Sequence, residues 1–302
     1  MKSNSKAKPL KAIEKEKENA LEPKVRQRPV KAYNNRDFLA SSDARNIRIL
    51  CEFEEPLVRF RRNKVRHTIV FFGSARIRSR ETAETYLKKV EYELSDMKEQ
   101  TADVHHMREV ARRGVELSQY YEDAAELSER LTRWSFETLR KSHRFYVCSG
   151  GGPGIMEAAN LGAHRTGYQS VGLNISLPYE QLPNPYQSEE LSFEFHYFFM
   201  RKFWFVYLAK ALVVFPGGFG TMDEMFELLT LVQTQKTKKY MPIILYGSKF
   251  WREIVNFQAL VKWGVVSPDD MNLFQFVDTV DEAYPYLTKE LTRLYLVEKH
   301  IE

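Results

Sequence analysis

Short, continuous apolar runs alternate with longer segments of helical periodicity through most of the chain, and this alternation constrains the fold more than any other feature. The runs are HTIVFFGSA (67–75), FYVCSG (145–150), SVGLNI (170–175), ALVVF (211–215) and PIILYG (242–247). Uninterrupted apolar runs of this length are typical of parallel strands that are buried on both faces. The sequence therefore predicts an α/β protein with three α/β/α layers and a mainly parallel sheet.

The amino-terminal part of the chain differs in composition from the rest. Residues 1–32 contain ten Lys or Arg and four Glu, a net charge of +6, while the whole chain of 302 residues carries +5. The remaining residues therefore carry a net −1, and the basic character belongs to this segment. A basic tail can contact polyanions, but we favour a solvated, disordered tail over residues 1–32.

The other domain boundaries follow from the helical patterns. Residues 33–66 are predicted to form a helical arm that extends the fold at the amino terminus, with Pro56 interrupting its helix. Residues 67–302 are predicted to form the α/β domain. A charged helical stretch at about 78–117 is predicted to be an insertion in that domain.

Several classes of protein are disfavoured by composition. The chain has two cysteines, which do not form a CxxC pair, and no apolar signal segment follows the early lysines. Its longest apolar stretch (193–215) is interrupted by Arg201, Lys202 and Lys210, so it is predicted to be a buried helix and strand rather than a membrane span. The histidines lack the spacing of a metal site. We expect a cytoplasmic protein without metal, cofactor, membrane contact or specific nucleic-acid partner.

Two glycine clusters follow predicted strands and precede predicted helices. They are GGGPG (150–154) and PGGFGT (216–221). Glycines let backbone N–H groups approach a ligand closely, and a helix amino terminus adds unpaired N–H groups and a favourable dipole for phosphate. Each cluster alone could be a tight turn, but two in one sheet indicate a nucleotide-like ligand. Neither cluster fits GxGxxG or the GK[ST] ending of a P-loop, and no GxSxG elbow is present.

Two charged residues near the second cluster have competing explanations. Glu224 follows Thr221 with the spacing of a capping box, so it could cap the helix rather than contact a ligand. Glu227, one turn later, is interpreted as a surface carboxylate. Arg201 lies in a helix that is apolar nearly all round, so a buried guanidinium there needs a partner. A substrate phosphate and Glu224 are both candidates for that partner.

The motifs SGGGPGIMEAANLGA (149–163), Arg201-Lys202 and PGGFGTMDE (216–224) occur in an order that resembles the Lonely Guy family. The resemblance covers about residues 67–294. Members of that family have a Rossmann-like fold and are phosphoribohydrolases. They act on nucleoside 5′-monophosphates, and some activate cytokinins. The resemblance implies that Arg201 and Glu224 are catalytic. It implies that substrate contacts come from the glycine-rich turns and the residues beside them: Gly73, Ser74, Gly151, Gly152, Gly154, Gly217, Gly218, Gly220 and Thr221.

The implied reaction is hydrolysis of the N-glycosidic bond of AMP, or of a related monophosphate, to free base and ribose 5-phosphate. The family's Met-His-x-Arg-Lys is Phe-Phe-Met-Arg-Lys at 198–202 here. Together with the insertion, this departure favours AMP over a cytokinin nucleotide. The family also implies a homodimer or higher homo-oligomer, whose interface could use the apolar helix that carries Arg201, although burial in the core would explain that helix equally well. Older lysine decarboxylase-like labels are not supported by a pyridoxal-phosphate lysine motif. A non-catalytic nucleotide-binding or carrier protein on the same fold is the alternative.

Overall fold

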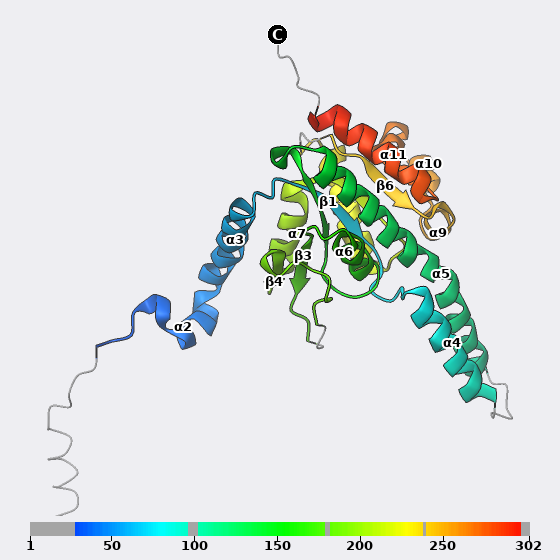
Figure 1. Cartoon of the computed structure of the whole chain (residues 1–302), viewed down its shortest axis with the longest axis horizontal. Coiled ribbons are helices and arrows are strands. Elements are labelled where there is room, and N and C mark those ends of the chain that lie inside the picture. Colours follow the sequence, from blue (N-terminus) through cyan, green and yellow to red (C-terminus); the bar gives the residue numbers. More distant parts are fainter. Residues whose placement is uncertain (1–27, 96–101, 179–181, 238–239, 297–302) are drawn as a thin grey trace, which may run out of the picture. The chain divides into compact units, whose positions relative to one another are not determined.

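The computed structural model describes residues 28–95, 102–178, 182–237 and 240–296 (Figure 1). Most of the predicted basic tail lies outside the described residues. The chain divides into two units, residues 1–48 and 49–302, and each is described by itself. This division falls inside a helix, whereas the sequence placed boundaries at 32 and 66, and those domain boundaries stay a prediction.

The first unit contains short helical segments. Its elements are the 3-10 turns η1 (Ala32–Asn34) and η2 (Ser42–Ala44), helix α2 (Arg36–Ala40) and the start of α3 (Arg45–Arg62). The Asn35 side chain caps α2 by accepting a hydrogen bond from the Phe38 N–H at 3.1 Å. The Arg48 guanidinium donates to the backbone carbonyls of Leu39 and Ser41, which ties the turn after α2 to the start of α3.

The second unit is built on a seven-stranded sheet in the described residues, and every neighbouring pair of strands is parallel. The strands are β1 (His67–Phe72), β2 (Phe145–Ser149), β3 (Val171–Ile175), β4 (Ser192–Phe195), β5 (Ala209–Val214), β6 (Ile243–Tyr246) and β7 (Gln275–Val277). Their order is β4-β3-β2-β1-β5-β6-β7. The direction of strand addition reverses between β1 and β5, and such a reversal opens a crevice at the carboxyl ends of the two strands.

Helices cover both faces of the sheet (Figure 1). One layer consists of α5 (Ala102–Arg133), α6 (Ile155–Arg165) and α11 (Val280–Leu291). The other consists of the end of α3 with α7 (Phe198–Leu208), α8 (Phe219–Gln233), α9 (Ser248–Ile254) and α10 (Phe257–Lys262). Helix α4 (Arg80–Ser95) pairs with the outer part of α5. Short segments complete the chain: the π-helical turns η3 (Trp134–Thr138) and η7 (Thr292–Leu296) and the 3-10 turns η4 (Lys141–His143), η5 (Glu189–Leu191) and η6 (Pro268–Leu273).

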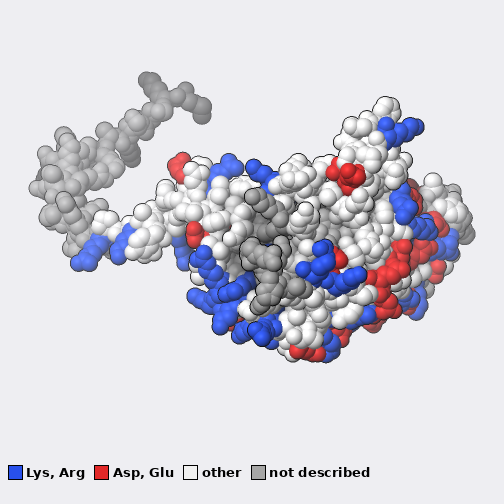
Figure 2. Space-filling model, turned by 90° about the horizontal axis from the view of Figure 1, so that it is seen from above, with Lys and Arg blue, Asp and Glu red and all other residues white. Residues whose placement is uncertain are grey.

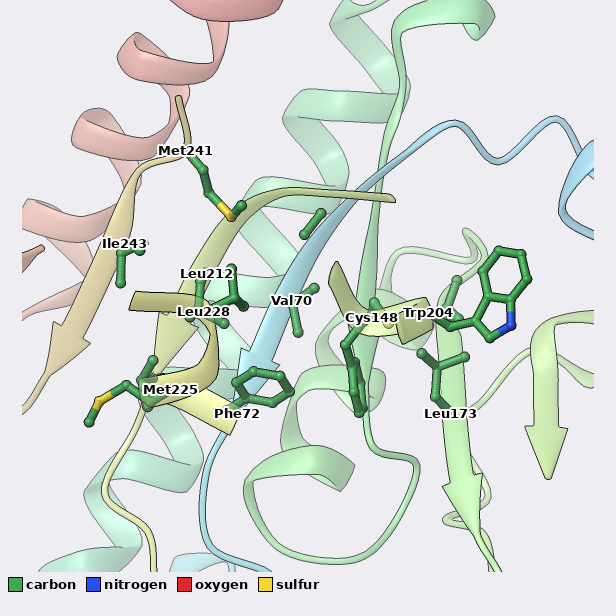
Figure 3. Close-up of a cluster of buried hydrophobic side chains, with 14 of the residues drawn as sticks. Val70, Phe72, Cys148, Leu173, Trp204, Leu212, Met225, Leu228, Met241 and Ile243 are labelled. Carbon is green, nitrogen blue, oxygen red and sulfur yellow. The ribbon is translucent and has the colours of Figure 1, made fainter. Parts of the chain in front are cut away.

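Successive side chains of the central strands point alternately into two hydrophobic cores, one on each face of the sheet. Ile69 and Phe71 of β1 pack under α5, α6 and α11, while Val70 and Phe72 pack on the opposite face. Figure 3 shows Val70 and Phe72 in one layer with Leu212 of β5 and Leu228 of α8. Burial of both faces explains why these strands are apolar without interruption. The predicted three-layer α/β/α fold with a parallel sheet is confirmed.

Three local predictions were wrong. Helix α3 runs through Pro56 instead of stopping there. Pro56 cannot bond the Glu52 carbonyl, and the Trp204 indole N–H donates to that carbonyl instead, at 2.9 Å. The pattern of apolar residues over 250–264 also predicts a single helix, but the structure breaks this segment into α9 and α10 at Val255 and Asn256.

The third wrong prediction concerns helix α7, which is only partly buried. Met200, Trp204 and Phe205 lie in the core. A second face leaves four aromatic side chains between 36% and 50% exposed: Phe198, Phe199, Phe203 and Tyr207. An apolar composition on every side therefore did not mean burial on every side. None of the helices in the described ranges is long and apolar enough to cross a membrane.

Candidate functional site

A cavity of about 640 Å³ lies at the carboxyl ends of the central strands, where the strand order reverses. Its lining includes the turn after β1 with Gly73 and Ser74, the first glycine cluster with Gly152, and the second with Gly218, Gly220 and Thr221. The Arg201 and Glu224 side chains complete one wall. The fold thus brings eight of the eleven predicted site residues to one cavity.

Helix α8 points its amino terminus at this cavity. The helix begins at Phe219, and its N-cap is Gly218, which has no side chain to cap it. The first N–H groups of a helix lack intrahelical partners, so those of Gly220 and Thr221 are available to a ligand. The capping box predicted from Thr221 and Glu224 was therefore wrong, because the helix starts one turn earlier and Thr221 is already inside it.

The other three predicted glycines shape the loops rather than line the cavity. Gly151 and Gly154 have φ values of 73° and 72°, which favour glycine. A side chain on Gly154 would collide with the backbone of Ser74, to which the Ile155 N–H donates a hydrogen bond at 3.1 Å. A side chain on Gly217 would collide with that of Thr221.

A buried amide network fixes the first glycine cluster from behind. The Asn184 side-chain amide donates to the carbonyls of Gly151 and Gly152 at 2.9 and 3.0 Å and to the Asn160 side chain at 3.0 Å. Gln187 adds a hydrogen bond to the Gly151 carbonyl at 2.7 Å. Since these carbonyls are bonded on the protein side, the loop is held in one conformation.

Arg201 of α7 and Glu224 of α8 form an ion pair, with Arg201 Nη2 and Glu224 Oε1 3.2 Å apart. Their side chains are only 11% and 13% exposed. The Arg201 guanidinium also lies over the rings of Phe198 and Phe205, at 5.2 and 5.6 Å from their centroids. Its buried Nε has no hydrogen-bond partner in the part of the chain that the structure describes. The pair therefore combines burial with an unused donor.

Burial raises the pKa of Glu224 to about 7, although the Arg201 charge pulls it down. Burial lowers the pKa of Arg201, and the facing Glu224 carboxylate raises it. A carboxyl group with a pKa near neutrality can accept or donate a proton at physiological pH. The site therefore contains a carboxyl group suited to acid–base chemistry, next to a guanidinium.

Neighbouring charges on the same two helices form a second cluster that does not belong to the cavity lining. The Lys202 ammonium contacts the carboxylates of Asp223 at 2.6 Å and Glu227 at 3.1 Å. These residues do not line the cavity. The Glu227 side chain is 38% exposed, in agreement with its interpretation as a surface carboxylate, and Glu227 provides a matched control for Glu224.

Helix α3 holds the start of α7, the helix that carries Arg201. The Glu52 carboxylate accepts hydrogen bonds from the His196 and Tyr197 N–H groups at 2.8 and 3.3 Å. These groups precede α7, whose N-cap Tyr197 makes no capping hydrogen bond with its side chain. Glu52 thus serves as a cap from another helix.

Several cavity residues were missed by sequence reasoning. Arg76 and Asn174 add polar groups to the lining. Besides Ala75 and Gly150, the remaining wall consists of larger apolar side chains: Phe72, Met156, Ile175, Leu177, Leu182, Phe198, Phe219 and Met222. Arg76 could have been predicted as a site residue from the sequence, because it stands two residues after Ser74 in the same turn. The apolar residues come from five separate segments, and only the tertiary fold brings them together.

Within the described ranges, no group of three or more His, Cys, Asp or Glu side chains is placed to hold a metal ion. Cys51 is exposed and Cys148 is buried, and neither forms a disulfide.

Comparisons with known proteins found a matching family model and similar solved structures. A family model described as "Possible lysine decarboxylase" matches residues 156–287, a range that includes Arg201 and Glu224. Among solved structures, TM1055, a structural genomics target, is 24% identical over 57% of this chain and 89% of that chain, with a TM-score of 0.40. The molybdenum cofactor binding protein of the phototrophic bacterium Rippkaea orientalis is 16% identical over the same shares, with a TM-score of 0.39. No curated protein matches the chain.

Proposed function

We propose that the chain, whose residues 156–287 match the "Possible lysine decarboxylase" family model and whose motifs resemble the Lonely Guy family, is a nucleoside 5′-monophosphate phosphoribohydrolase. The proposed reaction cleaves the N-glycosidic bond of AMP or a similar nucleotide with water. Its products are the free base and ribose 5-phosphate.

The 5′-phosphate binds at the amino terminus of α8 in this proposal. Gly218 and Gly220 leave room for close approach, since apart from their chain neighbours and the local helix backbone no atom lies within 4 Å of where a Cβ would stand. The N–H groups of the first helical turn and the Thr221 hydroxyl donate to phosphate oxygens. Binding energy at this remote group orients the ribose for reaction at C1′.

Glu224 acts on the sugar end of the nucleotide. As the bond between C1′ and the base nitrogen breaks, its electron pair leaves with the base, and positive charge develops on the ribose. The ionised Glu224 carboxylate stabilises that charge and accepts a proton from the water whose oxygen attacks C1′. The base takes up a proton from solvent as it leaves. Arg201 orients the carboxylate and donates to the substrate.

The observation that carries this proposal is the buried pair of Arg201 and Glu224 beside the α8 amino terminus, with the Glu224 pKa raised to about 7. A structural ion pair alone explains neither the position of both groups in the wall of the cavity nor the open donor on Arg201. The apolar wall around Phe198 and Met156 provides a surface for a purine base.

The test incubates the protein with a panel of 5′-monophosphates and measures the released free base by chromatography. We expect release by the wild type and by Glu227→Gln, and at least about a hundredfold slower release by Glu224→Gln. If the wild type binds AMP but releases no base from any monophosphate, the alternative of a nucleotide carrier replaces this proposal. The cavity lining contains no lysine among the described residues, which disfavours the lysine Schiff base of a pyridoxal-phosphate decarboxylase.

We also propose that a second copy of the chain covers the exposed aromatic face of α7. Four neighbouring aromatic side chains there are half-exposed, and a patch of this kind marks an interaction surface. Phe198 belongs both to this face and to the cavity lining, so the interface would adjoin the site. Sedimentation should show a dimer for the wild type and a monomer for Phe203→Ser, and a monomeric wild type would contradict the proposal.

A further inference from the structure

The cavity lies at the carboxyl ends of the strands. The amino ends of β1 and β2, at the other end of the sheet, carry a concentration of positive charge that the proposed reaction does not use. No Asp or Glu occurs in residues 56–80 or in residues 138–156. The exposed cations of these segments at the amino ends of β1 and β2 are named here the cationic patch: Arg61, Arg62, Lys64, Arg66, Arg140 and Lys141.

The two segments of the patch lie side by side. Strands β1 and β2 pair in register, with His67 opposite Phe145, so the residues just before each strand are neighbours. The rings of His67 and Phe145 are 5.4 Å apart, and the Tyr146 hydroxyl reaches the Asn63 carbonyl at 3.5 Å. The end of α3 and the turn η4 therefore form one surface.

The charges of this surface are not neutralised locally. Within the part of the chain that the structure describes, none of the six cations forms an ion pair with a carboxylate. The nearest ion pairs, Arg59 with Glu55 and Arg133 with Glu137, stand at the rim. Burial lowers the pKa of the adjoining His67 to about 4, and Lys210, His143 and Arg66 lower it further by their charges. Figure 2 shows Lys and Arg gathered in one region with few carboxylates among them, whereas both signs are mixed elsewhere on that face.

We propose that the cationic patch binds the phosphate backbone of double-stranded nucleic acid without regard to sequence. Four of its six cations are arginines, whose planar guanidinium matches phosphate oxygens in a bidentate manner. Repeated contacts to backbone phosphates supply the affinity of such binding.

The surroundings of the patch argue for this partner over others. Among the described residues of 56–67 and 138–144, Val58 is the one large apolar side chain that is exposed. A membrane-binding surface would present several such side chains for insertion, and a protein interface would use a cluster of them for its core. Single-stranded nucleic acid would be bound with exposed aromatic rings for base stacking, and the patch has none.

The position of the patch keeps it clear of the cavity, because the patch lies at the amino ends of the strands and the cavity lies at their carboxyl ends. Binding of a nucleic acid should therefore leave cavity chemistry intact. Residues 33–302 carry a net charge of only −1, so composition did not predict this surface. The carboxylates that balance its charge lie on other elements.

The test measures binding of the full-length chain to a labelled DNA duplex at salt concentrations from about 50 to about 200 mM. One variant combines Arg61→Gln, Arg62→Gln, Arg140→Gln and Lys141→Gln. The control combines Lys88→Gln, Lys249→Gln, Lys262→Gln and Lys289→Gln, which changes the net charge equally at exposed sites elsewhere. Circular dichroism and thermal unfolding verify that each variant is folded. Two double variants are also measured separately, one with Arg61→Gln and Arg62→Gln at the end of α3 and one with Arg140→Gln and Lys141→Gln at the start of η4.

We expect the patch variant to bind at least about tenfold more weakly than the control, and a plot of log affinity against log salt to be less steep by about 3 to 4. Each pair alone should show about half of that change in slope. Equal binding by patch and control variants overturns the proposal, as does a wild type that does not bind DNA. Binding to phosphatidylglycerol vesicles or to poly-glutamate as tight as to DNA also overturns it, in favour of a membrane or an acidic protein.

Discussion

Replacing Glu224 with glutamine tests the burial of its carboxyl group through the pH dependence of stability. The pKa of Glu224 is about 7 in the folded protein, against an ordinary value of 4.5. Between these pH values the folded protein binds more protons than the unfolded chain. The free energy of unfolding must therefore fall as pH rises through this window. The full loss of stability, caused by ionising the buried carboxyl group, is reached above about pH 7.

The magnitude follows from the two pKa values. At about 1.4 kcal/mol per pH unit, the interval from 4.5 to about 7 costs about 3 kcal/mol of stability. Glutamine at position 224 does not titrate, so loss of its pairing with Arg201 changes stability by an amount that does not depend on pH. His67, whose pKa is lowered to about 4, is present in both proteins and cancels in the comparison.

The assay is urea unfolding of the wild type and of Glu224→Gln at intervals from about pH 4.5 to about pH 8. Relative to the variant, the wild type should lose about 3 kcal/mol across this range. Two parallel curves would refute the reasoning, because they would mean that Glu224 titrates alike in the folded and unfolded chains. A wild type that gains stability over the range would mean that Arg201 outweighs burial.

Three further predictions concern the cavity and its framework. For base release from AMP, kcat/KM should rise with pH up to about 7 and then level off, and a flat profile would contradict Glu224 as the base. Adenosine should show a kcat/KM at least about a hundredfold below that of AMP, and equal values would contradict phosphate binding at the α8 amino terminus. Glu52→Ala should lower the free energy of urea unfolding by about 1 kcal/mol, whereas Glu54→Ala, on the exposed side of α3, should not.

The strands and turns could be predicted from the sequence because their signals are local. Each apolar run is a strand, and both glycine clusters lie where a strand ends and a helix begins. Eight of the predicted site residues line the cavity, because the carboxyl ends of parallel strands meet at one edge of the sheet.

Predictions failed where one residue's partner lies far away in the sequence. Glu224 has the spacing of a cap, yet α8 begins at Phe219 and the carboxylate faces Arg201, 23 residues earlier. Pro56 should have broken α3, but Trp204 bonds the carbonyl that the proline leaves free. The pairing of Glu224 with Arg201 was one of two candidates that the sequence left open, but no local pattern reveals that Trp204 bonds the Glu52 carbonyl.

The apolar helix α7 and the charge of the chain illustrate a different limit. Composition gives the number of apolar or charged side chains in a segment, but not how these side chains are distributed over the surface. Helix α7 buries Trp204 and exposes Phe203, its neighbour in sequence, although the two have the same character. Similarly, near neutrality over residues 33–302 did not reveal the cationic patch at one end of the sheet.

The most direct test of the central claim is to incubate the purified chain with AMP and to quantify adenine and ribose 5-phosphate together. The proposed hydrolysis predicts both products in equal amounts from the wild type and from Glu227→Gln, and at most traces from Glu224→Gln. Equal activity of Glu224→Gln and the wild type, or adenine without ribose 5-phosphate, would contradict the proposal that Glu224 drives hydrolysis at C1′.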